Sequence, residues 1–61
     1  MKMKEVREMT EEELNKTVVE LQQEKLNLQI QSRTGQLENP GRIRQVRRDI
    51  ARVKTEIAAR A

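Results

Sequence analysis

The sequence predicts an all-α fold, an antiparallel two-helix coiled-coil hairpin, for this chain of 61 residues. Two series of apolar residues recur at intervals of three and four positions, which is the period of a coiled-coil seam. The sequence has no strand signals, internal repeats or low-complexity tracts. We therefore expect one helical-hairpin domain over residues 1–61. Its candidate core consists of Leu14, Val18, Leu21, Leu28, Ile43, Val46, Ile50, Val53 and Ile57.

A first long helix is expected from about residue 11 to residue 33. Thr10 and Glu13 have the spacing of a capping box, in which the Thr10 hydroxyl accepts from the Glu13 amide and the Glu13 carboxylate reaches back to the Thr10 amide. Gln, Glu, Lys and Leu dominate the segment, and all of them favour helix. Gly35 can adopt the left-handed conformation that ends many helices.

A second long helix is expected from about residue 40 to residue 59, after a connection over residues 34–39. Asn39 is a favourable N-cap residue, and Pro40 suits the first helical position because its missing N–H would be unpaired there in any case. Gly41 weakens the first turn by about 1 kcal/mol relative to alanine. A connection this short predicts that the second helix returns antiparallel to the first.

A short helical turn over residues 2–8 is expected ahead of the hairpin, and it would fold Met3 or Val6 back onto it. This charged segment lacks the apolar stretch that a secretion signal needs. No part of the sequence approaches the roughly 20 apolar residues of a membrane-spanning helix. We therefore expect neither a secretion signal nor a membrane association.

The first helix carries a second apolar stripe, which consists of Val19, Leu26 and Ile30. Lys25 interrupts the main seam, so either its aliphatic stem packs while its ammonium group reaches water, or the assigned face is wrong. One partner helix cannot cover both stripes. The spare stripe would meet the N-terminal turn, a neighbouring protein, RNA sugars or solvent.

The second helix places cationic side chains opposite its apolar seam, because successive residues are rotated by about 100°. Residues 35–61 hold seven basic and three acidic side chains, whereas residues 11–34 hold three and five. Arginines four positions apart repel one another, but each can donate two hydrogen bonds to a phosphate. RNA is therefore the favoured partner, and a solvated charged face, an acidic protein, a membrane surface and DNA are the alternatives. Arg44, Arg48 and Arg52 are expected to form a row almost directly opposite the seam, with Arg47 and Lys54 on one shoulder of the helix.

The composition argues against several classes of function. The chain contains no Cys, His, Phe, Tyr or Trp. It therefore lacks thiolate and imidazole metal ligands, the usual neutral-pH acid or base, and aromatic platforms for stacking bases. Two thin helices also enclose no small-molecule pocket. We expect no enzyme activity, cofactor, metal site or small-molecule substrate, and the lack of cysteine fits a cytoplasmic location.

Three segments resemble a family of bacterial large-subunit ribosomal proteins, the one numbered twenty-nine. The most specific segment is Thr-Gly-Gln-Leu-Glu-Asn-Pro at residues 34–40, followed by Arg-Ile-Arg-Gln-Val-Arg-Arg-Asp-Ile-Ala-Arg at residues 42–52. Residues 5–14 and 27–31 resemble the N-terminus and the mid-helix motif of the family. The sequence departs from the usual family pattern at Lys25, Leu26, Gln29 and Gly41.

The resemblance implies a long helical hairpin that binds large-subunit ribosomal RNA, within cytoplasmic ribosomes and near the polypeptide exit tunnel. Its implied neighbour is ribosomal protein number twenty-three, and a ribosome-bound chaperone and the signal recognition particle are further implied partners. A free-standing coiled-coil interaction module is the competing interpretation. The RNA-contacting residues expected on these grounds are Arg42, Arg44, Arg47, Arg48, Arg52, Lys54, Thr34, Gln36 and Asn39.

Overall fold

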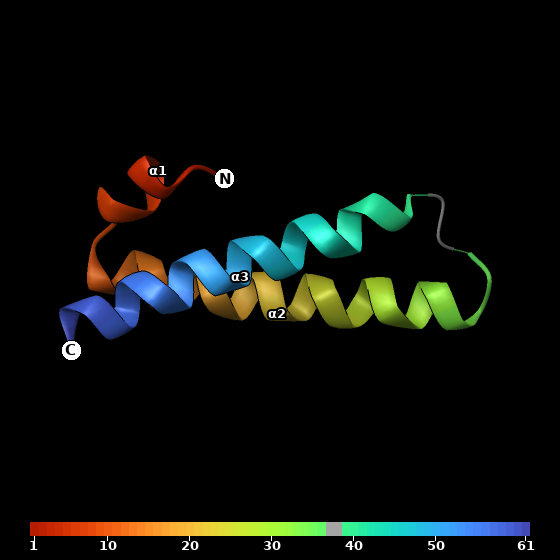
Figure 1. Ribbon diagram of the computed structural model, residues 1–61. Coiled ribbons are helices and arrows are strands. Elements are labelled where there is room, and N and C mark those ends of the chain that lie inside the picture. Colours follow the sequence, from red (N-terminus) through yellow and green to blue (C-terminus); the bar gives the residue numbers. More distant parts are fainter. Residues whose placement is uncertain (37–38) are drawn as a thin grey trace.

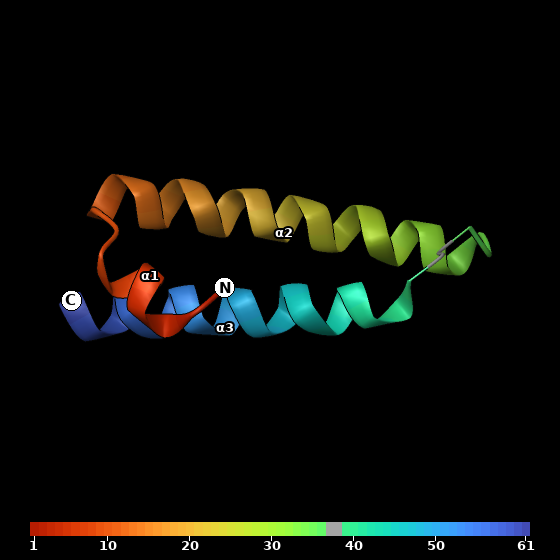
Figure 2. The same ribbon diagram turned by 90° about the horizontal axis from the view of Figure 1, so that it is seen from above.

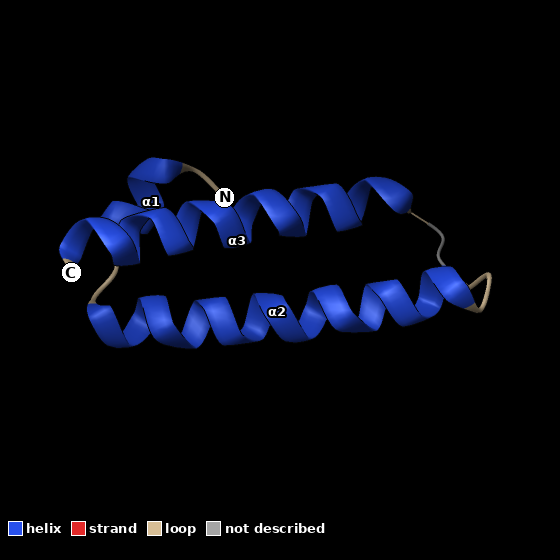
Figure 3. Cartoon of the chain, turned by 60° about the horizontal axis from the view of Figure 1, so that its bottom comes forward, coloured by secondary structure: helices blue, strands red, loops and turns tan. Residues whose placement is uncertain are grey.

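The computed structural model describes residues 1–36 and 39–61, and it is a helical hairpin with a short helix laid against one end (Figure 1). Helix α1 spans Met3–Arg7, α2 spans Glu11–Arg33 and α3 spans Pro40–Arg60. Helices α2 and α3 run antiparallel within a rod of 39 × 17 × 14 Å. Within the described ranges the chain contains no strand (Figure 3). The all-α hairpin fold is therefore confirmed.

Side-chain caps fix where the long helices begin. The Thr10 Oγ1 atom accepts a hydrogen bond from the Glu13 amide at 3.2 Å, and the Asn39 Oδ1 atom accepts one from the Gly41 amide at 3.1 Å. Both N-caps are thus confirmed. Only half of the expected capping box forms, because the exposed Glu13 carboxylate makes no hydrogen bond to Thr10 among those of the described residues.

Helix α2 ends in a Schellman motif. Gly35 has φ +74°, and its amide donates to the Ser32 carbonyl at 3.3 Å. The next amide, of Gln36, donates to the Gln31 carbonyl at 2.8 Å. These are the two hydrogen bonds that pair the last carbonyl groups of a helix when a left-handed residue follows it. The rest of the predicted connection includes Leu37 and Glu38, which lie outside the described residues.

The core lies between α2 and α3 and is closed at one end by α1. Because their inward faces are apolar, the two long helices bury the main seam of α2 against the seam of α3. Val18, Leu28 and Ile57 pack partly buried at its edges, and Ile43 is half-buried near the connection. The buried apolar side chains are Val6, Leu14, Leu21, Val46, Ile50 and Val53.

The second stripe of α2 faces away from this core. Val19, Leu26 and Ile30 are 62%, 51% and 52% exposed. Lys25, which interrupts the main seam, is half-buried. The half-burial of Lys25 agrees with a side chain whose stem packs, and it locates the hairpin contact on the Leu14–Leu28 side of α2. No helix in the described parts of the chain is both long and apolar enough to cross a membrane.

Helix α1 rests on α3, and the chain start lies over the middle of α3 (Figure 2). The guanidinium group of Arg60, at the end of α3, holds the other end of this segment. Its Nη2 donates to the Arg7 carbonyl at 2.9 Å and its Nη1 to the Met9 carbonyl at 2.7 Å. The Glu56 carboxylate orients the same group by accepting from Nε at 3.2 Å.

Candidate nucleic-acid interface

An open cationic surface covers the outer side of α3. Val46, Ile50 and Val53 face the core, so residues on the opposite side of this helix point to solvent. Arg44 and Arg48 lie on that side, and Arg47 and Lys54 lie on one shoulder of the helix. All four are exposed, and none forms an ion pair within the described part of the chain. We call these residues the open cationic face: Arg44, Arg47, Arg48 and Lys54.

Small side chains continue this side of α3 toward its C-terminal end. Ala51 and Thr55 are exposed, and the Thr55 hydroxyl is folded onto its own helix, where it donates to the Ala51 carbonyl at 2.7 Å. Neither side chain extends far from the helix surface. The helix surface beside the neighbouring arginines is therefore low here.

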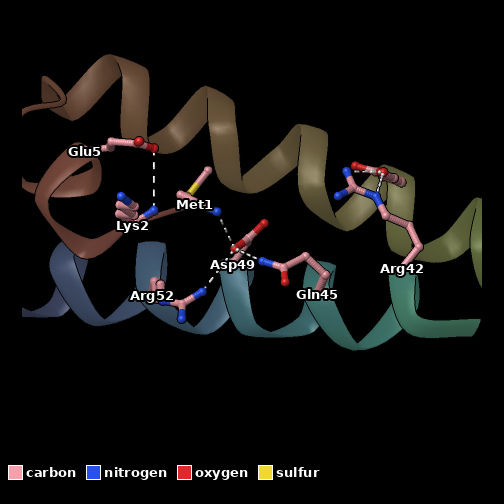
Figure 4. Close-up of polar contacts among 8 residues, drawn as sticks. Met1, Lys2, Glu5, Arg42, Gln45, Asp49 and Arg52 are labelled. Carbon is pink, nitrogen blue, oxygen red and sulfur yellow. Dashed lines mark hydrogen bonds and ion pairs between the residues drawn. The ribbon is translucent and has the colours of Figure 1, made fainter.

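Arg42 has a different environment from the open cationic face. Its Nε lies 2.8 Å and its Nη2 2.6 Å from Oε1 of Glu24 on α2, so the guanidinium bridges the two long helices (Figure 4). Both side chains are partly exposed, at 45% and 38%. The sequence groups Arg42 with the RNA-contacting residues, but in this structure its charge is already matched across the hairpin.

Arg52 also departs from its expected position. The helical spacing groups it with Arg44 and Arg48, but its Nη1 lies 3.2 Å from Oδ1 of Asp49 (Figure 4). The physical reason is that Asp49 is only 5% exposed, and a buried carboxylate requires a nearby cation. The expectation of a straight row at 44, 48 and 52 is therefore corrected: the arginine at 52 turns toward the flank of the helix.

The flank of α3 beside α1 carries a polar row that was not predicted from the sequence. Asp49 Oδ1 accepts from Gln45 Nε2 at 3.1 Å and from Arg52, and the Met1 ammonium group lies 3.5 Å away. The α3 residues of this row follow one another at intervals of three or four positions, which places them on one side of the helix, beside the apolar seam. That spacing is the sequence signal for this row, which comprises Gln45, Asp49, Arg52, Glu56 and Arg60.

The predicted loop contacts have structural roles at the helix ends. The Thr34 hydroxyl donates to the Ile30 carbonyl at 3.2 Å and to the Gln31 carbonyl at 3.1 Å, and Asn39 caps α3. Gln36 is exposed and takes part in the turn through its backbone amide. Thr34, Gln36 and Asn39 thus lie at the connection end of the hairpin, whereas Arg48 and Lys54 lie further along α3.

The described residues gather no group of three or more carboxylate, histidine or cysteine side chains that could hold a metal ion. An open pocket of about 220 Å³ lies between the start of α2 and the end of α3. Glu11 and Arg60 are its charged lining residues, and Arg60 is engaged with the α1 segment. The clearest site for a charged ligand is therefore the open cationic face.

Residues 4–60 match the family described as Ribosomal L29 protein. The chain is 57% identical over 60 residues to the large ribosomal subunit protein uL29 of Natranaerobius thermophilus, covering 98% of this chain and 92% of that protein. It is 60% identical over 57 residues to the uL29 of Alkaliphilus oremlandii, covering 93% and 85%. It is 55% identical over 60 residues to the uL29 of Geobacillus stearothermophilus, covering 98% and 91%.

Proposed function

The chain belongs to the ribosomal L29 protein family, and on this premise we propose that it is a structural constituent of the large ribosomal subunit that binds ribosomal RNA through α3. It acts by positioning RNA rather than by chemistry, as expected of a family of ribosomal proteins. Its place of action is the ribosome in the cytoplasm. The observation that carries the RNA-binding role is the open cationic face.

The charge distribution supports this role energetically. Arg44 and Arg48 lie one turn apart, and Arg47 lies between them in sequence, so their mutual repulsion works against the free helix. An RNA backbone replaces that repulsion with attraction, because each guanidinium can donate two hydrogen bonds to a phosphate. Contacts of this kind recognise the shape and backbone of folded RNA rather than its base sequence.

The position of the chain in the ribosome and its protein partners are proposed from its resemblance to the ribosomal protein family. We propose that the hairpin lies near the polypeptide exit tunnel, beside ribosomal protein number twenty-three, where a ribosome-bound chaperone and the signal recognition particle dock. The exposed stripe Val19, Leu26 and Ile30 on α2 is the apolar surface available for a protein neighbour. It lies away from α3, so a protein and RNA could be contacted at the same time.

Charge reversal at the open face tests RNA binding. Arg48→Glu should weaken binding to large-subunit ribosomal RNA by more than about 1 kcal/mol, because it puts a negative charge against phosphate. Lys16→Glu is the matched control, since it changes the net charge equally on an exposed position of α2. Circular dichroism should give nearly unchanged helicity for both. Equal loss of affinity in the two variants would refute the assignment of the face.

A free-standing coiled-coil module is the second candidate, and the exposed apolar stripe of α2 is the observation that favours it. Such a module would form a stable dimer through Val19, Leu26 and Ile30 without RNA. Analytical ultracentrifugation of the chain with and without ribosomal RNA separates the two proposals. A dimer that ignores RNA supports the module, whereas a monomer that sediments with RNA supports the ribosomal role.

A further inference from the structure

The chain start is bound to α3 by an ion pair with a buried carboxylate. Asp49 is 5% exposed, and its Oδ1 lies 3.5 Å from the α-amino nitrogen of Met1 (Figure 4). Its other cationic partner is Arg52 at 3.2 Å, and Gln45 adds a neutral donor. The negative charge of Asp49 is therefore shared between a guanidinium of its own helix and an ammonium from the other end of the chain.

Apolar contacts of the same segment bring this amino group to Asp49. Val6 is completely buried, and Met1 and Met3 pack against the core cluster. At the other end of the segment, the Arg60 guanidinium donates hydrogen bonds to the carbonyl groups of Arg7 and Met9. The segment is thus attached to α3 at both ends: by Arg60 at one and by the Met1 ammonium group at the other.

The chemical state of the Met1 nitrogen matters because its partner is buried. A free amino group carries a positive charge and three N–H donors at neutral pH. A formyl group, an acetyl group or a preceding residue converts the same nitrogen into a neutral amide with a single donor. Removing one charge from a buried pair leaves the other poorly compensated, and this is more destabilising than losing a surface pair.

We propose that Asp49 is the docking site of a free α-amino group at Met1, so that blocking this nitrogen loosens α1 from α3. The proposal concerns modification of the chain and does not depend on RNA binding. It assigns Asp49 a role outside the open cationic face, even though the carboxylate is adjacent in sequence to Arg48. The proposal also identifies the Met1 amino group as a partner of the polar row of α3.

Chemical synthesis of the 61-residue chain allows the charge to be varied at one atom. Three forms would be compared: a free amino group, an N-formyl group and an N-methyl group, which keeps the positive charge. The readout is amide hydrogen exchange at Val6 and Met9, whose amides are hydrogen-bonded within the segment. The Val53 amide, in the middle of α3, serves as an internal reference for global unfolding.

The N-formyl form should exchange at Val6 and Met9 at least about tenfold faster than the free form, the size expected for losing one charged contact to a buried carboxylate. The N-methyl form should stay close to the free form. In an Asp49→Asn chain, formylation should have little further effect. Equal acceleration by formyl and methyl groups, an equal effect of formylation in both backgrounds, or no acceleration would overturn the proposal. If Asp49→Asn does not fold, the comparison of formyl with methyl decides alone.

Discussion

Arg42 of α3 and Glu24 of α2 form the ion pair that joins the two long helices, with Nε and Nη2 lying 2.8 Å and 2.6 Å from Oε1. Within residues 1–36 and 39–61, the other ion pairs lie inside α3 or join α3 to the chain start. This pair lies toward the connection, where Ile43 is only half-buried. It therefore ties the hairpin together at the end that the apolar core holds least firmly.

A double-mutant cycle with Arg42→Gln and Glu24→Gln should give a coupling free energy of about 0.5 kcal/mol, because both side chains are partly exposed and water screens their attraction. Thermal or urea unfolding of the four chains measures it. The pair Lys16→Gln and Glu24→Gln, about two helical turns apart on α2, is the control and should show no coupling. Additive effects in the Arg42 cycle would mean that the contact does not stabilise the fold.

Truncating a side chain in the core should destabilise the chain more than truncating one in the exposed stripe of α2. Ile50→Ala should lower the free energy of unfolding by roughly 2–4 kcal/mol, because it leaves a cavity in the seam between the long helices. Ile50 is 9% exposed, whereas Ile30 on the outer stripe of α2 is 52% exposed. Ile30→Ala is therefore the matched control, with an expected loss within about 0.5 kcal/mol. Similar losses at the two positions would contradict the packing described here.

Removal of the Arg60 guanidinium should release α1 while leaving the hairpin folded. Arg60→Ala deletes two hydrogen bonds to carbonyl groups at the end of α1, and a loss of about 1 kcal/mol is expected for such partly exposed contacts. Hydrogen exchange should quicken at Met9 but not at Val53. Arg33→Ala, in the last turn of α2, removes an exposed arginine as a control. Uniform quickening along the chain would show that Arg60 supports the whole hairpin instead.

Substitution of the glycine that ends α2 should be costly for a backbone reason. Gly35 has φ +74°, and a Cβ there would meet no atom within 4 Å, so crowding by other residues is not involved. Gly35→Ala should still destabilise the chain by about 1 kcal/mol, because an L-residue is strained in this conformation. Gly35→Asn should lose less, since asparagine tolerates left-handed geometry better. A chain stabilised by alanine would imply a different turn.

Local sequence signals were sufficient to predict the helix ends and the main seam. Thr10 and Asn39 cap helices through their own side chains, and Gly35 ends a helix because only glycine takes its conformation without strain. These effects depend on a few consecutive residues. The seam is equally local, because a repeat of three and four residues places apolar side chains on one helix face wherever the partner lies.

The apolar docking of α1 was predicted, because Val6 is buried and Met3 packs against the core, but its polar contact with α3 could not be predicted in the same way. The burial of Asp49 depends on Met1, which is 48 positions away in sequence but 3.5 Å away in space. A helical wheel shows Asp49 only as a polar residue beside the seam, and it does not show that a second segment covers it. The departure of Arg52 has the same origin, because its guanidinium turns toward a carboxylate whose burial arises from tertiary structure.

The salt dependence of RNA binding tests the role of the open cationic face most directly. If its four cations each neutralise one phosphate, log K should fall with log salt with a slope of about −3. Arg48→Gln should make this slope shallower by about one unit, whereas Arg42→Gln, which removes an arginine already paired with Glu24, should leave it nearly unchanged. A flat salt response of the parent chain, or an equal change in slope from both variants, would contradict the account.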